Sequence, residues 1–210
     1  MPINLRNANN PRIYLASRSP RRRELLAQIG VHFDTIAFRN HPREDAEVDE
    51  TPLADEVPVD YVQRVARAKA GYGREIVETR RLVGQPVLAA DTTLALDGEI
   101  IGKPLDMRDA QRILRRLSGQ THQVLTAVAV AFAGRVEAAL SVSDVRFGEL
   151  DDETIRLYAQ SAEPMDKAGA YAIQGRAGLF VAHLAGSYSG VMGLPLFETG
   201  ELLRRFDFPL

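Results

Sequence analysis

The sequence predicts an α/β protein, because short apolar runs typical of strands alternate along the chain with segments of helical periodicity. The first run, residues 13–16, is followed at once by a helical pattern that ends at Gly30. A second run, PVLAAD at residues 86–91, leads to Asp97-Gly98 between apolar flanks, which indicates a β-hairpin. Two long apolar runs around Ala133-Gly134 indicate another antiparallel pair.

The first predicted unit is a strand, a tight turn and a helix around the stretch LASRSPRRR, residues 15–23. Ser19 suits the N-cap position of the helix, and Pro20 suits its first turn. Three arginines follow, where the helix dipole disfavours an exposed cation by roughly 0.3–1 kcal/mol. An anion bound by the turn amides, by the Ser17 hydroxyl and by the guanidinium groups would reverse that cost. A solvated basic face is the alternative, and the stretch alone does not decide between the two.

A long acidic stretch separates the first unit from the next helix. Residues 33–36 predict a second strand, and residues 38–57 predict a loop that at this length is either flexible or functional. Pro58 then opens a helix that we expect to end near Gly71. Lys69 would lie in its last turn, where a cation suits the helix dipole.

The strand at residues 86–91 stops at Asp91, so we expect this carboxylate at a strand end, where ligands of α/β proteins bind. The hairpin that follows should return Lys103 toward Asp91. Residues 163–178, which contain Lys167 and Gln174, lack any periodicity and predict backbone that passes close to other groups. The other expected elements are a helix capped by Asp106 and closed by Gly119, strands at residues 124–132, 136–147 and 179–184, a helix begun by Asp151 or Asp152, and a C-terminal helix begun by Pro195.

Composition excludes several classes of function. The 210-residue chain has a net charge of -2, so no global field favours nucleic acid or an anionic membrane as a partner. It has no cysteine, which excludes disulfides, a thiol nucleophile and a thiolate zinc site. The N-terminal residues lack the apolar core of a signal peptide, and no apolar run reaches membrane-spanning length. We therefore expect a cytoplasmic protein.

Lysine is rare in this chain. All but three of its 26 basic residues are arginine, and the exceptions are Lys69, Lys103 and Lys167. Because lysine is a compact, flexible point charge, these positions are candidates for a role that a guanidinium cannot fill. Chance is the alternative explanation for each of them.

The remaining motifs narrow the chemistry by elimination. The four histidines lack paired zinc-ligand spacing, GSYSG has its serines at the wrong positions for a serine hydrolase, and neither a Walker loop nor a dinucleotide fingerprint is present. Cations and carboxylates at loops and element ends remain. Such a set suits metal-assisted chemistry on phosphates, with a hard divalent ion held by carboxylate oxygens.

Several motifs in order, LASRSPRRRELLAQIG, YVQRVARAKA, AADTTLALDGEIIGKP, LSGQTHQVLTAVAV, DKAGAYAIQG and GSYSGVMGLPL, resemble those of the Maf family of nucleoside triphosphate pyrophosphatases. The resemblance extends from about residue 12 to residue 205. It implies a curved mixed β-sheet flanked by helices, with two lobes and a central cleft, as in inosine triphosphatases. It also implies a flexible tail at residues 1–11 and a single pyrophosphatase domain at residues 12–210. Gly190 departs from the family pattern, because a larger residue is expected there.

The combination of AADTT with DKAGAYAIQG resembles the branch of the family that acts on dTTP and UTP, with modified pyrimidine nucleotides as further possible substrates. That branch hydrolyses the bond between the α and β phosphates and releases pyrophosphate and a nucleoside monophosphate. The resemblance implies Mg²⁺ or Mn²⁺ as cofactor and a homodimer. Two alternatives stay open: a 7-methyl-GTP pyrophosphatase, and a nucleotide-binding regulator of cell division or septum formation. The regulator needs no intact Asp91, whereas the enzymes do.

The family motifs also assign roles to residues of this chain. Five of them would bind the substrate: Ser17, Arg21 and Arg22 at the triphosphate, Thr92 at the pyrimidine edge, and Gln174 orienting the water or the base. Three would be catalytic: Asp91 as general base or as the residue that positions the metal and the attacking water, and Lys69 and Lys103 sharing the phosphate charge. Asp91 and Glu50 would be the carboxylates on the metal side.

Overall fold

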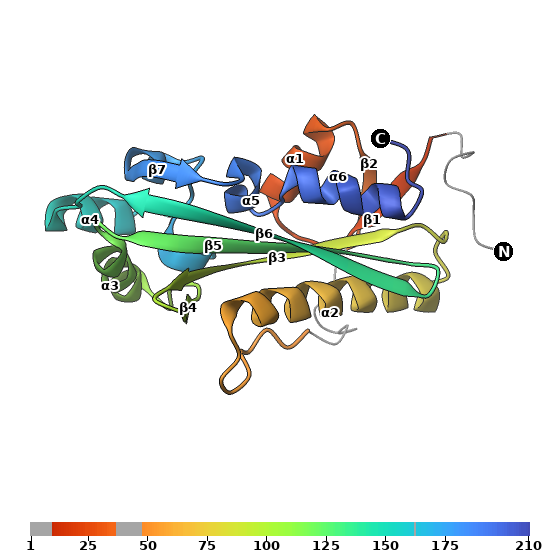
Figure 1. Cartoon of the computed structure of the whole chain (residues 1–210), viewed down its shortest axis with the longest axis horizontal. Helices are drawn as coiled ribbons and strands as arrows, with labels where there is room; N and C mark the ends of the chain where they lie inside the picture. Colours follow the sequence, from red (N-terminus) through yellow and green to blue (C-terminus); the bar gives the residue numbers. More distant parts are fainter. Residues whose placement is uncertain (1–9, 37–47, 162) are drawn as a thin grey trace.

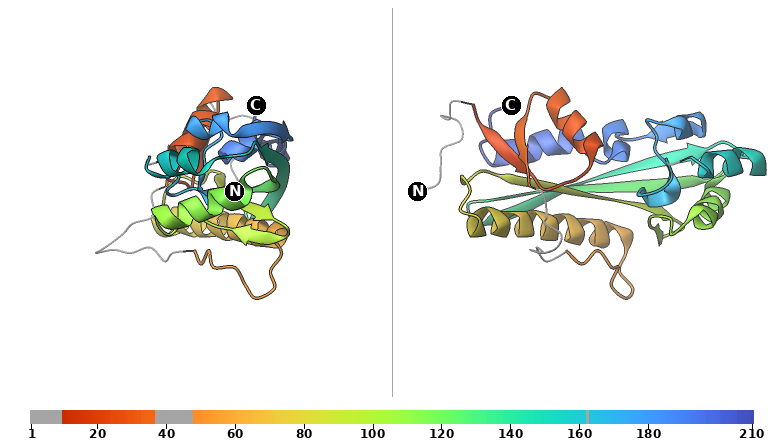
Figure 2. Two further views of the ribbon diagram at one scale, coloured as in Figure 1. Left: turned by 90° about the vertical axis from the view of Figure 1, so that its left-hand side faces the viewer. Right: turned by 180° about the vertical axis from the view of Figure 1, so that it is seen from behind.

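The computed structural model describes residues 10–36, 48–161 and 163–210, which fold around a seven-stranded mixed sheet with helices on both faces (Figures 1 and 2). The sheet order is β2-β1-β3-β5-β6-β7, with β4 paired to β3. β1 runs parallel to β2 and β3, and the other pairs are antiparallel. The α/β class and the mixed sheet are therefore as expected. The strands are β1 (Arg12–Leu15), β2 (His32–Thr35), β3 (Val87–Leu96), β4 (Glu99–Ile101), β5 (Thr121–Phe132), β6 (Arg135–Phe147) and β7 (Val181–Ala185).

Helices cover the two faces of the sheet in different ways. α2 (Pro58–Thr79) lies along one face, and α1 (Pro20–Gln28) and α6 (Leu196–Arg205) lie on the other (Figure 1). α3 (Met107–Leu117) and α4 (Asp152–Ala159) gather with β7 at one end of the molecule. The short elements are the 3₁₀ turns η2 (Ala168–Ala170) and η3 (Arg176–Leu179) and the five-residue helix α5 (Tyr188–Met192). None of the described helices is long and apolar enough to cross a membrane.

Buried side chains form three clusters that follow this arrangement. Along β3, Val87 and Ala89 pack under α2, whereas Leu88 and Ala90 pack under α1 and α6. This alternation follows from the two-residue period of a strand. The third cluster fills the end of the molecule among α3, α4 and the segment that follows α4. Two ends with separate cores correspond to the two expected lobes.

α2 is longer than the sequence predicted. It runs to Thr79, so the expected end near Gly71 is wrong. Gly73 explains why a second glycine is tolerated within the helix: a Cβ there would lie 2.7 Å from Val87 Cγ1 and 3.1 Å from Ala16 Cβ. The glycine therefore permits close packing of helix on sheet. Lys69 is consequently not in the last turn, and the helix dipole does not explain it.

β3 also continues beyond its predicted end. Asp91 lies within the strand, paired with Ala127 of β5, so the expectation that the strand stops at Asp91 is wrong. On the opposite edge, β1 pairs with β3 only as far as Leu88, and β4 pairs with it only from Leu94. Within the described residues, β3 therefore has a strand neighbour on one side only between these two points. This open stretch of edge is the interval in which Asp91 and Thr92 lie.

Other local predictions are confirmed. Asp97-Gly98 turns β3 into β4 with positive φ at both residues, and Ala133-Gly134 does the same between β5 and β6. The side chain of Asp106 caps α3 and that of Asp151 caps α4. Of the expected N-terminal tail, residues 1–9 lie outside the described residues, as do residues 37–47 of the long acidic loop.

Candidate active site

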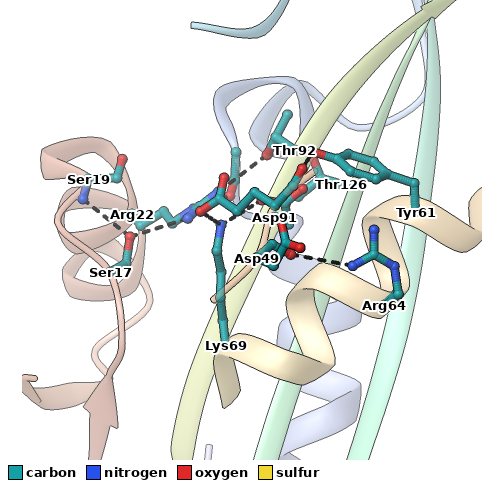
Figure 3. A network of polar contacts seen from close by, with 12 residues as sticks. Ser17, Ser19, Arg22, Asp49, Tyr61, Arg64, Lys69, Asp91, Thr92 and Thr126 are labelled. Atoms are coloured by element: carbon teal, nitrogen blue, oxygen red, sulfur yellow. Dashed lines mark hydrogen bonds and ion pairs between the residues drawn. The ribbon is translucent and has the colours of Figure 1, made fainter. Parts of the chain in front are cut away.

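The candidate site surrounds the open stretch of β3. Because adjacent residues of a strand point to opposite faces, Asp91 turns toward α2 and Thr92 toward α1 and α5. Figure 3 shows Lys69 reaching this pair from α2 and Arg22 reaching it from α1. The missing strand neighbour leaves room at the edge for side chains from both faces to meet. The site therefore has two halves, an acidic half around Asp91 and a basic half around Arg22.

In the acidic half, one lysine joins two carboxylates. Lys69 Nζ lies 2.8 Å from Asp91 Oδ1 and 2.8 Å from Glu50 Oε1. Asp91 is only 6% exposed, and the Lys69 side chain is 15% exposed. The cation thus fixes the positions of both carboxylates and compensates their charges.

Glu50 reaches the site from the described part of the long loop, which is fastened to α2. Tyr61 Oη donates a hydrogen bond to the backbone carbonyl of Glu50 at 2.9 Å. Arg64 binds both carboxylate oxygens of Glu56, at 2.6 and 2.8 Å, and donates to the Thr51 carbonyl at 3.0 Å. The hydrogen bonds from Arg64 lower the pKa of Glu56 to about 2. The loop is therefore held where Glu50 can contact Lys69.

The electrostatics of the acidic half follow from these contacts. Burial alone would raise the pKa of Glu50, but the charge and hydrogen bond of Lys69, together with the charges of Lys103 and Arg22, hold that pKa below its usual value. Burial, followed by the charges of Asp91 and Glu50, raises the pKa of Tyr61 to about 12. Tyr61 therefore stays protonated and keeps donating to the loop at any ordinary pH.

In the basic half, the oxygens that bind Arg22 among the described residues are all neutral. Its Nε donates to the Gly193 carbonyl at 2.8 Å, Nη1 to Ser17 Oγ at 3.2 Å, and Nη2 to Thr92 Oγ1 at 3.4 Å. Within the described parts of the chain, no carboxylate forms an ion pair with it. Burial lowers the pKa of Arg22, although the charge of Asp91 opposes that shift. A desolvated cation without an ion-pair partner is an environment in which an anion binds favourably.

The start of α1 supports the same conclusion. Ser19 occupies the N-cap position as predicted, but its side chain makes no capping hydrogen bond. Its backbone N–H instead donates to Ser17 Oγ at 3.2 Å. The first turn holds no acidic residue. The Ser19 hydroxyl therefore does not satisfy the amides of the first turn of α1. The positive end of this helix also has no anionic side chain in its first turn.

The structure brings together six of the sequence-predicted site residues by direct contact: Ser17, Arg22, Glu50, Lys69, Asp91 and Thr92. Lys103 follows β4 and acts on Glu50 through its charge. Burial and then the charge of Arg21 lower the pKa of Lys167. Gln174 is exposed between η2 and η3, and no hydrogen bond among the described residues ties it to the cluster.

Four residues of the site were missed in the sequence: Tyr61, Arg64, Thr126 and Gly193. Tyr61 and Arg64 fasten the loop, and the helical pattern indicated only that Tyr61 packs. Thr126 is the polar member of an apolar stretch of β5, which is a usable signal for a buried hydrogen bond. Gly193 has φ +110, and its left-handed backbone turns its carbonyl toward Arg22.

No group of three or more His, Asp or Glu side chains that could hold a metal ion exists among the described residues. Asp91 and Glu50 offer two carboxylates on either side of Lys69. Mg²⁺ in nucleotide enzymes is commonly bound by one or two carboxylates together with substrate phosphates and water. The donor set therefore fits a metal that shares its coordination with a phosphate ligand.

Comparisons with known proteins identify the family. A family model described as Maf-like protein matches residues 12–206. A dTTP/UTP pyrophosphatase of Dechloromonas aromatica is 68% identical over 197 residues, which are 94% of this chain and 98% of that protein. A dTTP/UTP pyrophosphatase of Aromatoleum aromaticum is 58% identical over 200 residues, covering 95% and 97% of the two chains. A solved structure of the Staphylococcus aureus Ham1 protein aligns with a TM-score of 0.49 and 15% identity, over 93% of this chain and 97% of that one. The family model and the two relatives confirm the resemblance seen in the sequence motifs, and the chain belongs to the Maf family.

Proposed function

We propose that the protein is a nucleoside triphosphate pyrophosphatase that hydrolyses dTTP and UTP to the monophosphate and pyrophosphate. The names of the relatives that are 68% and 58% identical support this substrate class. The observation that carries the proposal is the pairing of the two halves of the site. A partly buried guanidinium without an ion-pair partner among the described residues lies beside a buried carboxylate held by lysine. One half suits a phosphate group, and the other suits activation of a water molecule.

In this proposal the basic half binds the triphosphate. Arg22 binds phosphate oxygens through the N–H groups that its protein partners leave unused, and Ser17 holds it in place. Arg21 lies in the same first turn of α1 and contributes a second guanidinium. Lys103 shares the negative charge from the side of β4. Together these cations would stabilise the charge that develops on the leaving pyrophosphate.

The acidic half would activate the water. Asp91 accepts a proton from the attacking water as a general base, and Lys69 holds its carboxylate in one orientation. A bound Mg²⁺ or Mn²⁺ would supply neutralisation of phosphate charge, with Asp91 and Glu50 as its protein ligands. Because Lys69 contacts both carboxylates, it would also hold them near one another, by offsetting part of their mutual repulsion, before the metal and substrate arrive.

Gln174 would help orient the attacking water or the general base, and its side chain is exposed. The Thr92 hydroxyl contacts Arg22 and Thr126, so its contacts favour a role in holding Arg22 over the expected role at the pyrimidine edge. The proposal also includes a single domain over residues 12–210, a cytoplasmic location and a homodimer. Light scattering on the purified protein tests the homodimer.

The decisive experiment measures pyrophosphate release from dTTP, UTP, 7-methyl-GTP and ATP with Mg²⁺ or Mn²⁺. Asp91→Asn serves as the control, because it keeps the size of the side chain and removes the base. We expect turnover of dTTP and UTP, lowered by roughly 10²–10⁴ in the control. A preference for 7-methyl-GTP would assign the chain to the other enzymatic branch. Nucleotide binding without any turnover would favour the regulator.

A further inference from the structure

Two features of the site are not explained by the proposed chemistry, namely Thr126 and Gly190. Thr126 is fully buried in the apolar middle of β5, directly opposite Thr92 in the register of β3 and β5. Gly190 lies in α5 and departs from the residue that the family resemblance led us to expect. Buried hydroxyls are normally hydrogen-bonded, so the partners of Thr126 indicate its role.

Thr126 stands between a carbonyl and a second hydroxyl. Its Oγ1 lies 2.8 Å from the Gly190 carbonyl oxygen and 3.0 Å from Thr92 Oγ1. Thr92 Oγ1 in turn lies 3.4 Å from Nη2 of Arg22. These contacts form a chain from Arg22 through Thr92 and Thr126 to the backbone of α5 (Figure 3).

Thr126 Oγ1 is the donor in both of its contacts, to the Gly190 carbonyl and to Thr92 Oγ1. Its single hydroxyl proton is therefore shared between these two acceptors. Thr92 Oγ1 accepts from Thr126 and from Nη2 of Arg22, which can only donate. Thr126 thus contacts the same hydroxyl oxygen that contacts Arg22.

α5 closes this chain into a ring. Gly193, the C-cap residue that follows α5, accepts from Nε of Arg22 at 2.8 Å, while Gly190 within α5 accepts from Thr126. A Cβ at position 190 would lie 3.1 Å from Ser187 Cβ and 3.2 Å from Ser141 Oγ. Glycine therefore lets the backbone of α5 lie close enough to the sheet to present its carbonyl. This gives a physical reason for the departure at position 190.

The ring determines which donors of Arg22 remain for a ligand. A guanidinium has five N–H groups. Ser17, Thr92 and the Gly193 carbonyl take one each, from Nη1, Nη2 and Nε. One N–H is left on each terminal nitrogen, an arrangement suited to two oxygens of one phosphate.

We propose that Thr126 is a positioning residue, which through Thr92 fixes the plane of the Arg22 guanidinium and so directs its two unused N–H groups at the phosphates. The inference rests on the proposed function, in which Arg22 binds the triphosphate. Thr126 itself is buried and touches no substrate.

The test compares Thr126→Val, which keeps the shape and removes the hydroxyl, with Thr126→Ser, which keeps the hydroxyl. We expect Thr126→Val to raise the KM for dTTP and the Kd for inorganic pyrophosphate by roughly tenfold, the order of one hydrogen bond, with a smaller change in kcat. Thr126→Ser should stay within about twofold of the wild type for both constants. If Thr126→Val folds poorly, Thr126→Ala gives the same readout with space for a water.

Two further variants separate positioning from general stability. Thr199→Val makes the same exchange at a fully buried threonine of α6 whose hydroxyl has no partner among the described residues, and it should leave both constants unchanged. Adding Thr126→Val to Thr92→Val should cost little more than Thr92→Val alone, because both act on Arg22 through one chain.

The outcomes distinguish the two proposals. A wild type that turns over neither dTTP nor UTP contradicts the proposed function, and pyrophosphate binding to Thr126→Val then still reports on Arg22. An active wild type with unchanged KM and pyrophosphate Kd in Thr126→Val overturns the inference, even if the melting temperature falls. Additive losses in the double variant also overturn it.

Discussion

Arg22 and Lys69 are two cations of one site, yet their surroundings differ. Lys69 contacts two carboxylates, at 2.8 Å each, whereas Arg22 contacts two hydroxyls and a carbonyl. Both side chains are largely removed from water, so each needs its charge compensated. For Lys69 the protein supplies that compensation itself. Arg22 forms no ion pair among the described residues, although the charges of Asp91 and Glu50 act on it without direct contact, so an anionic ligand gains most there.

This difference explains how a site can bind a polyanion next to its own carboxylates. A cation already paired with acids organises those acids and attracts an anion weakly. A cation held by neutral acceptors keeps its full charge for the ligand while its orientation is fixed. Replacing Arg22 should therefore lower activity most, whereas replacing Lys69 should also lower the free energy of unfolding.

The largest effect is expected from Arg22→Ala. Loss of its charge-assisted hydrogen bonds to phosphate should lower kcat/KM for dTTP by at least about a hundredfold. The melting temperature should change little, because no described carboxylate loses an ion pair. Steady-state kinetics and thermal melting measure the two quantities. Arg23→Ala, at an exposed neighbour in the same turn, is the matched control. It should leave both kcat/KM and the melting temperature unchanged. Parallel losses of activity and melting temperature in Arg22→Ala would show that Arg22 stabilises the fold as Lys69 does, and would contradict its role as a cation kept for the ligand.

Lys69→Met should act mainly on stability. It leaves the Asp91 and Glu50 carboxylates facing one another without a cation, which we expect to cost about 1–3 kcal/mol at pH 7.5 given the partial exposure of Glu50. At pH 5 the cost should shrink, because proton uptake by one carboxylate relieves the repulsion in the folded state. Urea unfolding at both pH values measures it. Arg22→Ala, measured alongside, should show no such pH dependence, and a pH-independent cost in Lys69→Met would refute the prediction.

The smallest effect is expected from Glu50→Gln. The folded state holds the pKa of Glu50 below its ordinary value of 4.5, so the wild type gains stability above that pH and loses it as the pH falls through the lowered value. With 44% of the side chain exposed, the gain should be under about 1 kcal/mol. Melting curves of wild type and variant at pH 6 and pH 3.5 should therefore converge at the lower pH. For Glu75→Gln, at an exposed position of α2, the difference in melting temperature from the wild type should be the same at both pH values.

The sequence predicted the residues of the site better than their placement. Family motifs selected Asp91, Lys69 and Arg22, which the fold brings together. The sequence predicted that α2 ends near its first glycine, Gly71, whereas the helix continues through it and through Gly73, which permits close packing against β3. A glycine that stops a helix and one that lets it approach a sheet are identical in a single sequence. Only the opposing Val87 distinguishes them.

Asp91 was misplaced for a related reason. A carboxylate after an apolar run normally marks the end of a buried strand, because burying an unpaired charge is costly. Here Lys69 pairs with it from α2, so the strand continues. The role of Thr126 was missed because its partners Thr92 and Gly190 come from strands and helices far apart in the chain. Contacts of this kind depend on tertiary structure and leave no local pattern.

The alternation of Asp91 and Thr92 along β3 has a consequence for how this stretch can change. Which of the two faces each side chain reaches is set by the register of β3 with β5, which is unbroken from Val87 to Ala95. An insertion or deletion of one residue upstream in that strand would exchange the two directions, turning the acid toward Arg22 and the hydroxyl toward Lys69. Single substitutions in β3 alter one half of the site, whereas a change in length disables both at once. The active site therefore depends on the pairing register of β3 as well as on the side chains that the strand carries.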